Sequence, residues 1–197
     1  VSSEIMILEG IVTTQNSAGD INVAPMGPIV DESMESFVLR PFQTSTTYKN
    51  LNGHPFGVLH VVDDVLLLAK AAISCLVETP ETFQAITIPA HVLKSACRWY
   101  EFRVDSFDDS EERILIEANV VHAGRLRDFF GFNRAKHAVL EAAILATRVH
   151  ILPADEIRSQ IDALRSPVEK TAGPDELEAF QFVDKYVQSS LFGGEGS

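Results

Sequence analysis

The chain has 197 residues, which is enough to bury a full hydrophobic core. Of these residues 46% are hydrophobic and 22% charged, a composition that excludes a disordered chain. Its formal net charge of −12 argues against nucleic-acid binding, because contact with the phosphate backbone depends on clustered Lys and Arg. Apolar runs such as 65–69 and 142–146 fall far short of the roughly 20 residues that a membrane-spanning helix needs, so we expect neither a membrane segment nor a targeting leader.

Most of the first two thirds of the chain is predicted to form β-strands. Short runs rich in Val, Ile, Phe and Thr are separated by turn residues, which predicts six strands, at 5–14, 22–30, 36–42, 56–62, 100–107 and 113–123. The polar segments 16–20 and 108–111 are typical of hairpin turns. Six strands with connections of mixed length favour a small antiparallel barrel.

Two helices are expected to interrupt these strands. One is predicted over 65–75, with Asp63 or Asp64 as its cap. The other is shorter and is predicted to begin at Pro89 and to end near residue 97.

The last third of the chain is predicted to be helical. Helices are expected over 134–147, 153–165 and 173–190, each preceded by a residue that favours a helix start, and the glycine-rich end 193–197 is expected to fray. The chain is therefore mainly β with α, with a barrel in residues 1–130 and a helical extension in residues 131–197.

Two segments in the first fifty residues have the composition of a ligand pocket. Residues 19–27 read Gly-Asp-Ile-Asn-Val-Ala-Pro-Met-Gly, which predicts a strand edge with exposed backbone donors beside a proline. Arg-Pro-Phe at 40–42 is followed by Thr-Ser-Thr-Thr-Tyr-Lys-Asn-Leu at 44–51, which gathers hydroxyls, amides and two cations where a short helix begins. A phosphate monoester is usually held in this way, so the two segments predict a pocket for a phosphorylated flat ring.

The candidate binding residues follow from these two segments. We expect the phosphate to contact side chains of the second segment, namely Arg40, Ser45, Thr46, Thr47, Lys49 and Asn50. We expect the ring to contact the first segment, at Asn22, Val23, Ala24, Pro25 and Met26. From the residues alone, the commoner outcome for the second segment is a polar turn with a solvated Arg40. For the first segment it is a β-turn followed by an edge strand.

The order and spacing of these motifs resemble the FMN-binding split-barrel superfamily, in particular its flavin reductase-like side and an uncharacterised branch with a helical C-terminal extension. Such proteins carry Asn-x-Ala-Pro after a turn, then a strand, then a Ser/Thr-rich stretch that ends in Thr-x-x-Asn-Ile or -Leu. Residues 22–25 and 47–51 stand in those places, and 117–122 is similar to the closing barrel strand. The resemblance covers roughly residues 4–125. It departs at Gly27, where many flavin reductases have Ser.

The resemblance implies a six-stranded antiparallel Greek-key split barrel, FMN as cofactor, and a homodimer with the flavin in the cleft between subunits. It further implies an FMN-dependent oxidoreductase of flavin reductase-like type, whose small-molecule electron donor or acceptor is not identified by any motif. A non-catalytic FMN- or ligand-binding dimeric module is the alternative, and a barrel that has lost its flavin is a third hypothesis. A pyridoxine phosphate, a deazaflavin and a pterin remain alternatives to FMN.

Other kinds of site are not predicted. The sequence lacks the Gly-x-Gly-x-x-Gly, Gly-x-x-x-x-Gly-Lys, His-Glu-x-x-His and Gly-x-Ser-x-Gly motifs, and the spacing of its six histidines predicts no metal site. No catalytic acid, base or nucleophile is predicted. Cys75 and Cys97 form no Cys-x-x-Cys pair, which favours two reduced thiols in a cytoplasmic protein.

A basic aromatic segment, residues 125–136, stands out in this acidic chain. It contains four cationic residues, one acidic residue and three phenylalanines. It could receive a second substrate or the partner chain's flavin, although a solvated face with ion pairs is the more common use of such a segment. Trp99 is expected to form a core or dimer contact.

Overall fold

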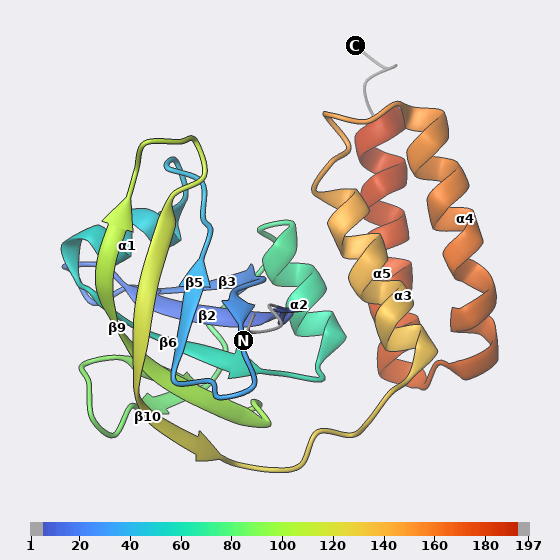
Figure 1. Ribbon diagram of the computed structural model, residues 1–197. Coiled ribbons are helices and arrows are strands. Elements are labelled where there is room, and N and C mark those ends of the chain that lie inside the picture. The colour runs from blue at the N-terminus through green and yellow to red at the C-terminus, as the bar shows by residue number, and fades with distance from the viewer. Residues whose placement is uncertain (1–5, 193–197) are drawn as a thin grey trace. The chain divides into compact units, whose positions relative to one another are not determined.

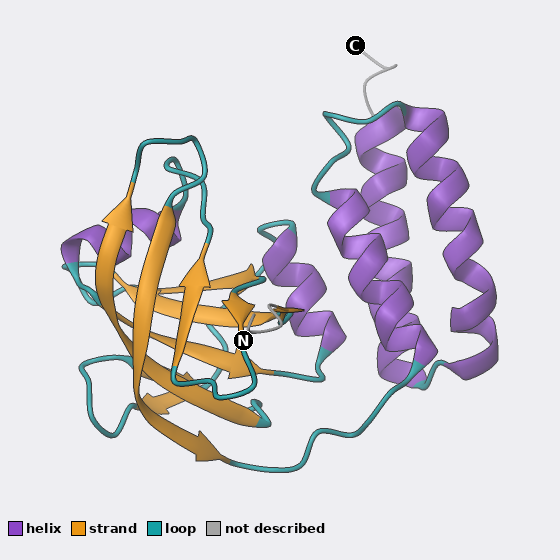
Figure 2. Ribbon diagram, in the orientation of Figure 1, coloured by secondary structure: helices purple, strands orange, loops and turns teal. Residues whose placement is uncertain are grey.

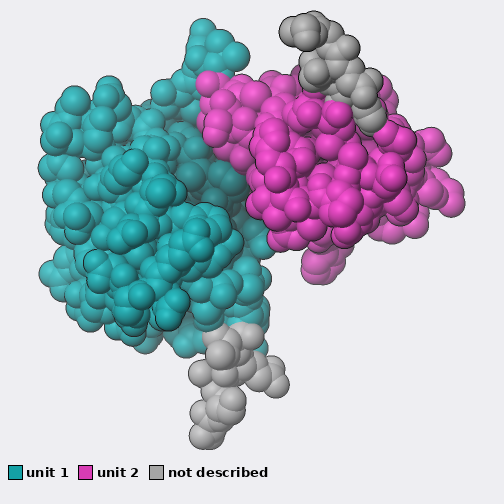
Figure 3. Space-filling view, turned by 90° about the horizontal axis from the view of Figure 1, so that it is seen from above, with its two compact units in different colours: residues 1–62, 77–129 teal, residues 63–76, 130–197 magenta. Residues whose placement is uncertain are grey.

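The computed structural model describes residues 6–192, so Ile5, the expected start of the first strand, and the glycine-rich end 193–197 lie outside the described residues. The chain divides into two compact units (Figure 3). One comprises the residues up to 62 together with 77–129, and the other comprises 63–76 together with the residues from 130 onward.

The first unit is built around one curled antiparallel sheet, drawn in orange in Figure 2. Its strands follow one another in space in the order β1–β4–β5–β10–β9–β6–β2–β3 (Figure 1). Their bounds are β1 (Met6–Ile7), β2 (Gly10–Gln15), β3 (Ile21–Met26), β4 (Ile29–Val30), β5 (Ser36–Leu39), β6 (Phe56–Val61), β9 (Arg98–Asp108) and β10 (Leu115–Arg125).

A single bent hairpin supplies both edges of this sheet. β2 pairs with β3 at one edge and β1 pairs with β4 at the other, while β1 runs into β2 and β3 runs into β4. The backbone N–H of Leu8 donates to the carbonyl of Pro28 at 3.1 Å, where both arms of the hairpin bend. Because the same two arms serve both edges, the sheet curls into a split barrel in which β3 pairs with β2 alone.

The bend also explains why the strand count differs from the six that were predicted. The runs 5–14 and 22–30 each form two strands, because pairing is interrupted at 8–9 and at 27–28. At this point Pro28 has no N–H to donate, and a Cβ on Gly27 would lie 2.9 Å from Cγ2 of Ile7. The predicted split barrel with a helical extension is otherwise confirmed.

The predicted helix from Pro89 to residue 97 is wrong. This region holds a separate two-stranded hairpin of β7 (Thr82–Gln84) and β8 (His91–Leu93). The hairpin is fixed by contacts distant in sequence: the Thr13 hydroxyl donates to the carbonyl of His91 at 2.6 Å, and the Leu93 N–H donates to Nε2 of His60 at 3.0 Å. Long-range pairing therefore overrides the local helix signal.

One short helix, α1 (Thr46–Gly53), belongs to the barrel unit. Its Leu51 is fully buried in the main core with Val12, Leu39, Phe102 and Ile116. Burying a side chain of this size contributes about 1.5 to 3 kcal/mol, so the core holds α1 at a fixed place on the barrel.

The second unit consists of the helices α2 (Val65–Ala72), α3 (Arg134–Ala146), α4 (Ala154–Thr171) and α5 (Pro174–Phe192). α2 packs on α3 and α5 although it is far from them in the chain. α4 continues six residues beyond its predicted end at 165, through Pro167, because Val168 is buried in the helical packing. No helix in the described part of the chain is long and apolar enough to cross a membrane.

Candidate functional site

The start of α1 separates its polar side chains into two groups. Ser45 caps the helix by accepting a hydrogen bond from the N–H of Tyr48 at 3.1 Å. Thr47 and Asn50 are buried against the barrel, whereas Ser45 is half-buried and Thr46 and Lys49 are exposed. The second predicted segment therefore has an inner face that attaches it to the sheet and an outer face that is open to a ligand.

One hydrogen bond joins the two predicted segments, and a second attaches α1 to the neighbouring strand β2. Asn22 on β3 donates through Nδ2 to the Thr47 hydroxyl at 3.2 Å, and Asn50 donates to the Thr14 hydroxyl at 3.1 Å. Thr14 pairs with Asn22 across β2 and β3, so both bonds lie at the same end of this strand pair. The structure thus brings together segments that lie 25 residues apart. Thr14 was not predicted as part of this site, because its role depends on strand register.

β3 forms one end of the strand order, and its six residues are all half-buried. Pro25 lacks a backbone N–H and is typical of such an edge strand. Side chains alternate along a strand, so those of Asn22, Ala24 and Met26 lie on one face. This face points toward the main core, against which Met26 packs. The side chains of Val23 and Pro25 lie on the opposite face.

Arg40 follows β5 directly and is half-buried. Its Nε is buried and has no hydrogen-bond partner within the described residues. Its carbonyl accepts a hydrogen bond from Nη1 of Arg113 at 3.2 Å, and the Arg113 guanidinium lies over the ring of Phe42 at 4.1 Å. A buried cationic donor without an acceptor is costly, and an anionic oxygen would satisfy it. The residues at this position therefore fit a phosphate group.

Two buried titratable groups of the barrel unit are already fully engaged in its structure. Glu101 accepts hydrogen bonds from the N–H groups of Ile86 and Thr87, from the Thr87 hydroxyl and from Nε1 of Trp99, at 2.7 to 3.1 Å. Burial raises the pKa of Glu101, but these four donors outweigh burial and lower it overall. Glu101 is thus a structural carboxylate that holds the loop before β8.

His60 is the other buried group. Its Nδ1 lies 3.0 Å from the carbonyl of Ile11, to which it donates, and Nε2 accepts from Leu93. Burial lowers the pKa of His60 to about 4, against a smaller opposing effect of the Ile11 carbonyl. Neither His60 nor Glu101 is placed as a general acid or base, and no group of metal-type ligands gathers among residues 6–192.

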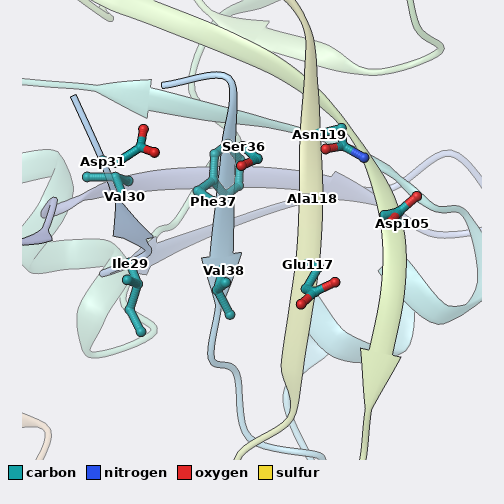
Figure 4. A pocket seen from close by; sticks show the side chains of 10 residues that line it. All are labelled: Ile29, Val30, Asp31, Ser36, Phe37, Val38, Asp105, Glu117, Ala118 and Asn119. Atoms are coloured by element: carbon teal, nitrogen blue, oxygen red, sulfur yellow. The ribbon is translucent and has the colours of Figure 1, made fainter. Parts of the chain in front are cut away.

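A cavity of about 340 Å³ lies elsewhere on the barrel, and none of the predicted site residues lines it (Figure 4). Its lining includes the carboxylates of Asp31, Asp105 and Glu117, which come from the end of β4, from β9 and from β10. The Ser33 hydroxyl lowers the pKa of Asp31, so this carboxylate stays charged. A phosphate would be repelled here, and this cavity is a poor candidate for a phosphorylated ligand.

Ion pairs engage Arg125 and Lys136 of the basic aromatic segment. Arg125 pairs with Asp128 at 3.1 Å, Arg127 donates to the carbonyl of Ser95 at 2.9 Å, and Lys136 pairs with Glu176 at 2.8 Å. The Arg125–Asp128 pair is exposed, as a solvated charged face requires, whereas the side chains of Lys136 and Glu176 are only 18% and 11% exposed. The phenylalanines of the segment remain exposed, whereas Trp99 is a core residue in a cluster with Val58, Ala90 and Val92.

Comparison with known proteins relates this fold to flavoproteins. The crystal structure of the FMN-bound protein MM1853 from Methanosarcina mazei, which carries the DUF447 family model, is 25% identical, with a TM-score of 0.78 over 91% of this chain and 94% of that chain. The 2-nitrobenzoate 2-nitroreductase NbaA of Pseudomonas fluorescens is 18% identical, with a TM-score of 0.51 over 64% and 66% of the two chains. An FMN-binding protein from Thermus thermophilus is 13% identical, with a TM-score of 0.51 over 64% and 74%.

The NbaA and Thermus structures show only that their fold is similar to the fold of this chain. No curated protein matches the chain. The model of the N-terminal domain of the protein family of unknown function DUF447 matches residues 8–127, and the second DUF447 model matches residues 133–185. The chain therefore belongs to the DUF447 family.

Proposed function

We propose that this protein is an FMN-binding flavoprotein and an oxidoreductase of flavin reductase-like type. In this proposal the FMN phosphate lies at the start of α1 and the ring lies along β3. The observation that carries the proposal is the buried Nε of Arg40, a cationic donor without an acceptor among the described residues, five residues before the Ser45 cap of the hydroxyl-rich start of α1. The FMN bound to the Methanosarcina protein supports it.

Each group of residues has a distinct part in this site. Arg40, Ser45, Thr46 and Lys49 would donate to the phosphate oxygens, because their polar atoms are not used to attach α1 to the sheet. Thr47 and Asn50 would act mainly as positioning residues, since both are buried and hydrogen-bonded to strand residues. Backbone groups of residues 22–26 would contact the ring edge.

FMN, when bound, supplies the hydride-transfer chemistry of such an enzyme. The residues of this chain would bind and orient it, which agrees with the absence of a placed acid or base among the buried groups described above. We further propose a homodimer with the flavin between the subunits, supported by the exposed phenylalanines of the basic aromatic segment. The electron donor or acceptor would be a small molecule.

The binding proposal is tested by titrating FMN and riboflavin into the purified protein and by the mass and absorption spectrum of any ligand that copurifies. We expect FMN to bind at least tenfold more tightly than riboflavin, because a single charge-assisted hydrogen bond is worth about 1.5 to 3 kcal/mol. Equal dissociation constants for the two flavins would show that no phosphate subsite exists, and the mass would identify a different ligand.

The catalytic part of the proposal needs a separate test. Under anaerobic conditions, NADH or NADPH should bleach the bound flavin if the protein turns over as an oxidoreductase. A flavin that binds tightly and stays oxidised with both donors would favour the non-catalytic binding module instead.

A further inference from the structure

We propose that Arg113 is a positioning residue for the FMN phosphate, because its guanidinium fixes the segment that carries Arg40 and leads into α1. The assignment rests on the FMN site proposed above and deepens it. Arg113 would not contact the ligand itself but would set the place of the residues that do.

The first observation is that the pairing of β5 with β10, which are neighbours in the sheet (Figure 1), continues past the end of β5. Leu39 pairs with Ile116, and three residues away Phe42 pairs with Arg113 in the same register. Two backbone hydrogen bonds, of 3.0 and 3.2 Å, flank the Phe42–Arg113 pair. Opposite side chains lie closest together at a pair that is flanked in this way, so the Arg113 side chain is held beside Phe42.

The second observation is that the Arg113 guanidinium contacts the residues on both sides of Pro41. Its Nη1 donates to the carbonyl of Arg40 at 3.2 Å, and its Cζ lies 4.1 Å from the centre of the Phe42 ring. Pro41 has no N–H to donate, so the backbone ladder holds this point with fewer bonds than an ordinary strand pair. The side chain of Arg113 supplies an attachment that the backbone cannot.

The third observation is that Phe42 also fixes the start of α1. The Ser45 N–H donates to the Phe42 carbonyl at 3.0 Å, and the Ser45 hydroxyl caps the helix. Arg113 is therefore connected to both halves of the proposed phosphate site. It reaches Arg40 through the carbonyl of that residue and the helix start through Phe42.

Exact placement matters for Arg40, because its buried Nε has no hydrogen-bond partner among the described residues. A hydrogen bond to a phosphate oxygen weakens steeply when its distance and angle are poor. Loss of Arg113 would let Arg40 and Ser45 shift together. The proposed ring contacts along β3 would be kept, since β3 pairs with β2 and not with this segment. The effect should therefore fall on FMN and spare riboflavin, which has no phosphate.

A double-mutant cycle tests this role. The dissociation constants of FMN and riboflavin are measured by fluorescence quenching for the unmodified full chain, for Arg113→Ala, for Arg40→Ala and for the double variant. We expect Arg113→Ala to weaken FMN binding roughly fivefold or more, the effect of about one hydrogen bond, and to leave riboflavin binding unchanged. The double variant should weaken FMN binding by less than the product of the two single effects, because Arg113 acts in part through Arg40.

A second variant and a matched control complete the experiment. Phe42→Leu removes the ring on which the guanidinium lies and should also weaken FMN binding without changing riboflavin binding. Arg103→Ala removes another exposed arginine of the same unit, one that lies opposite Phe56 and Asn119 in the sheet, and should leave both dissociation constants unchanged. Circular dichroism checks that each variant is folded, and Arg113 is exposed, so its loss should not disturb the core.

Several results would overturn the positioning role alone. One is an Arg113→Ala variant that binds FMN as the unmodified chain does, while Arg40→Ala binds it weakly. Equal losses of FMN and riboflavin binding would show a merely structural contact, and an equal loss in Arg103→Ala would show a general effect of charge. A double variant with the full product of the two effects would show that Arg113 acts independently of Arg40. Equal affinity of the unmodified chain for FMN and riboflavin would instead overturn the proposed phosphate site, and the positioning role with it.

Discussion

At the scale of single residues, Arg40 and Thr47 differ in how they serve the proposed phosphate site. Arg40 has a buried donor without an acceptor, so Arg40→Ala should weaken FMN binding tenfold or more, a loss of about 1.4 kcal/mol or greater, while the fold is kept. Thr47 is buried and accepts from Asn22, so Thr47→Ala should weaken FMN binding similarly and also lower the free energy of unfolding by about 1 kcal/mol.

Titration of FMN into these variants, alongside urea unfolding followed by circular dichroism, measures both effects. His137→Ala on α3 is the control and should leave FMN affinity nearly unchanged. Intact affinity in both Arg40→Ala and Thr47→Ala would place the phosphate elsewhere, and the basic aromatic segment would become the next candidate.

His60 gives a pH dependence whose sign follows from its hydrogen bonds. The folded protein keeps His60 neutral, since Nε2 must accept from Leu93, and its pKa is lowered from 6.5 to about 4. Between these values the unfolded chain binds the extra proton and the folded chain does not, so stability falls as the pH drops from 6.5 to about 4. The full loss is about 3 kcal/mol, of which about 2 kcal/mol should appear between pH 7 and pH 5.

Urea unfolding at the two pH values measures this loss. His60→Gln should reduce the pH dependence, and His54→Gln should retain it because His54 is exposed. A pH dependence that is the same in His60→Gln and in the unmodified protein would contradict the assignment to His60.

At the scale of elements, structure set by neighbouring residues could be predicted from the sequence, and structure set by distant contacts could not. The helix caps at Asp64 and Asn133 lie next to the helices they start, and their side chains accept from Leu67 and from Ala135 and Lys136 as expected for caps. The β7–β8 hairpin could not be predicted, because its position is fixed by Thr13 and His60 from distant strands. The joining of Asn22 to Thr47 likewise depends on where α1 packs.

The β7–β8 region also depends on Glu101, which gives a test at this scale. Glu101→Gln replaces one acceptor oxygen by an amide that faces donors, so buried N–H groups of the loop lose their partner. We expect the free energy of unfolding to fall by about 1 to 3 kcal/mol. Urea unfolding measures the change, with Glu117→Gln as the control, because Glu117 is exposed and should matter by less than about 0.5 kcal/mol. Equal stability of the two variants would show that the Glu101 contacts are not important for the fold.

At the scale of the whole molecule, the sequence predicts a barrel followed by helices, and the structure adds that α2 is part of the helical unit. This grouping could not be read from the sequence, because α2 is inserted between β6 and β7 and its partners α3 and α5 come much later. Its buried residues include Val65, Leu67, Leu68 and Ala69. Periodicity shows that such a helix has a buried face but does not identify what covers it.

The grouping makes a definite prediction for a chain that ends at residue 129. Such a truncation removes α3, α4 and α5 but leaves α2, whose apolar side chains then lose their partners and meet water. Each of the larger side chains forfeits about 1.5 to 3 kcal/mol of burial, and an apolar patch of this kind promotes association. We therefore expect the truncated chain to bind the dye ANS and to aggregate in size-exclusion chromatography, whereas the full chain should do neither.

The same truncation with Leu67 and Leu68 replaced by Gln is the control and should be more soluble, because the barrel core around Val12 and Phe102 contains no residue of α2. A monodisperse truncated chain that does not bind ANS would contradict the assignment of α2 to the helical unit.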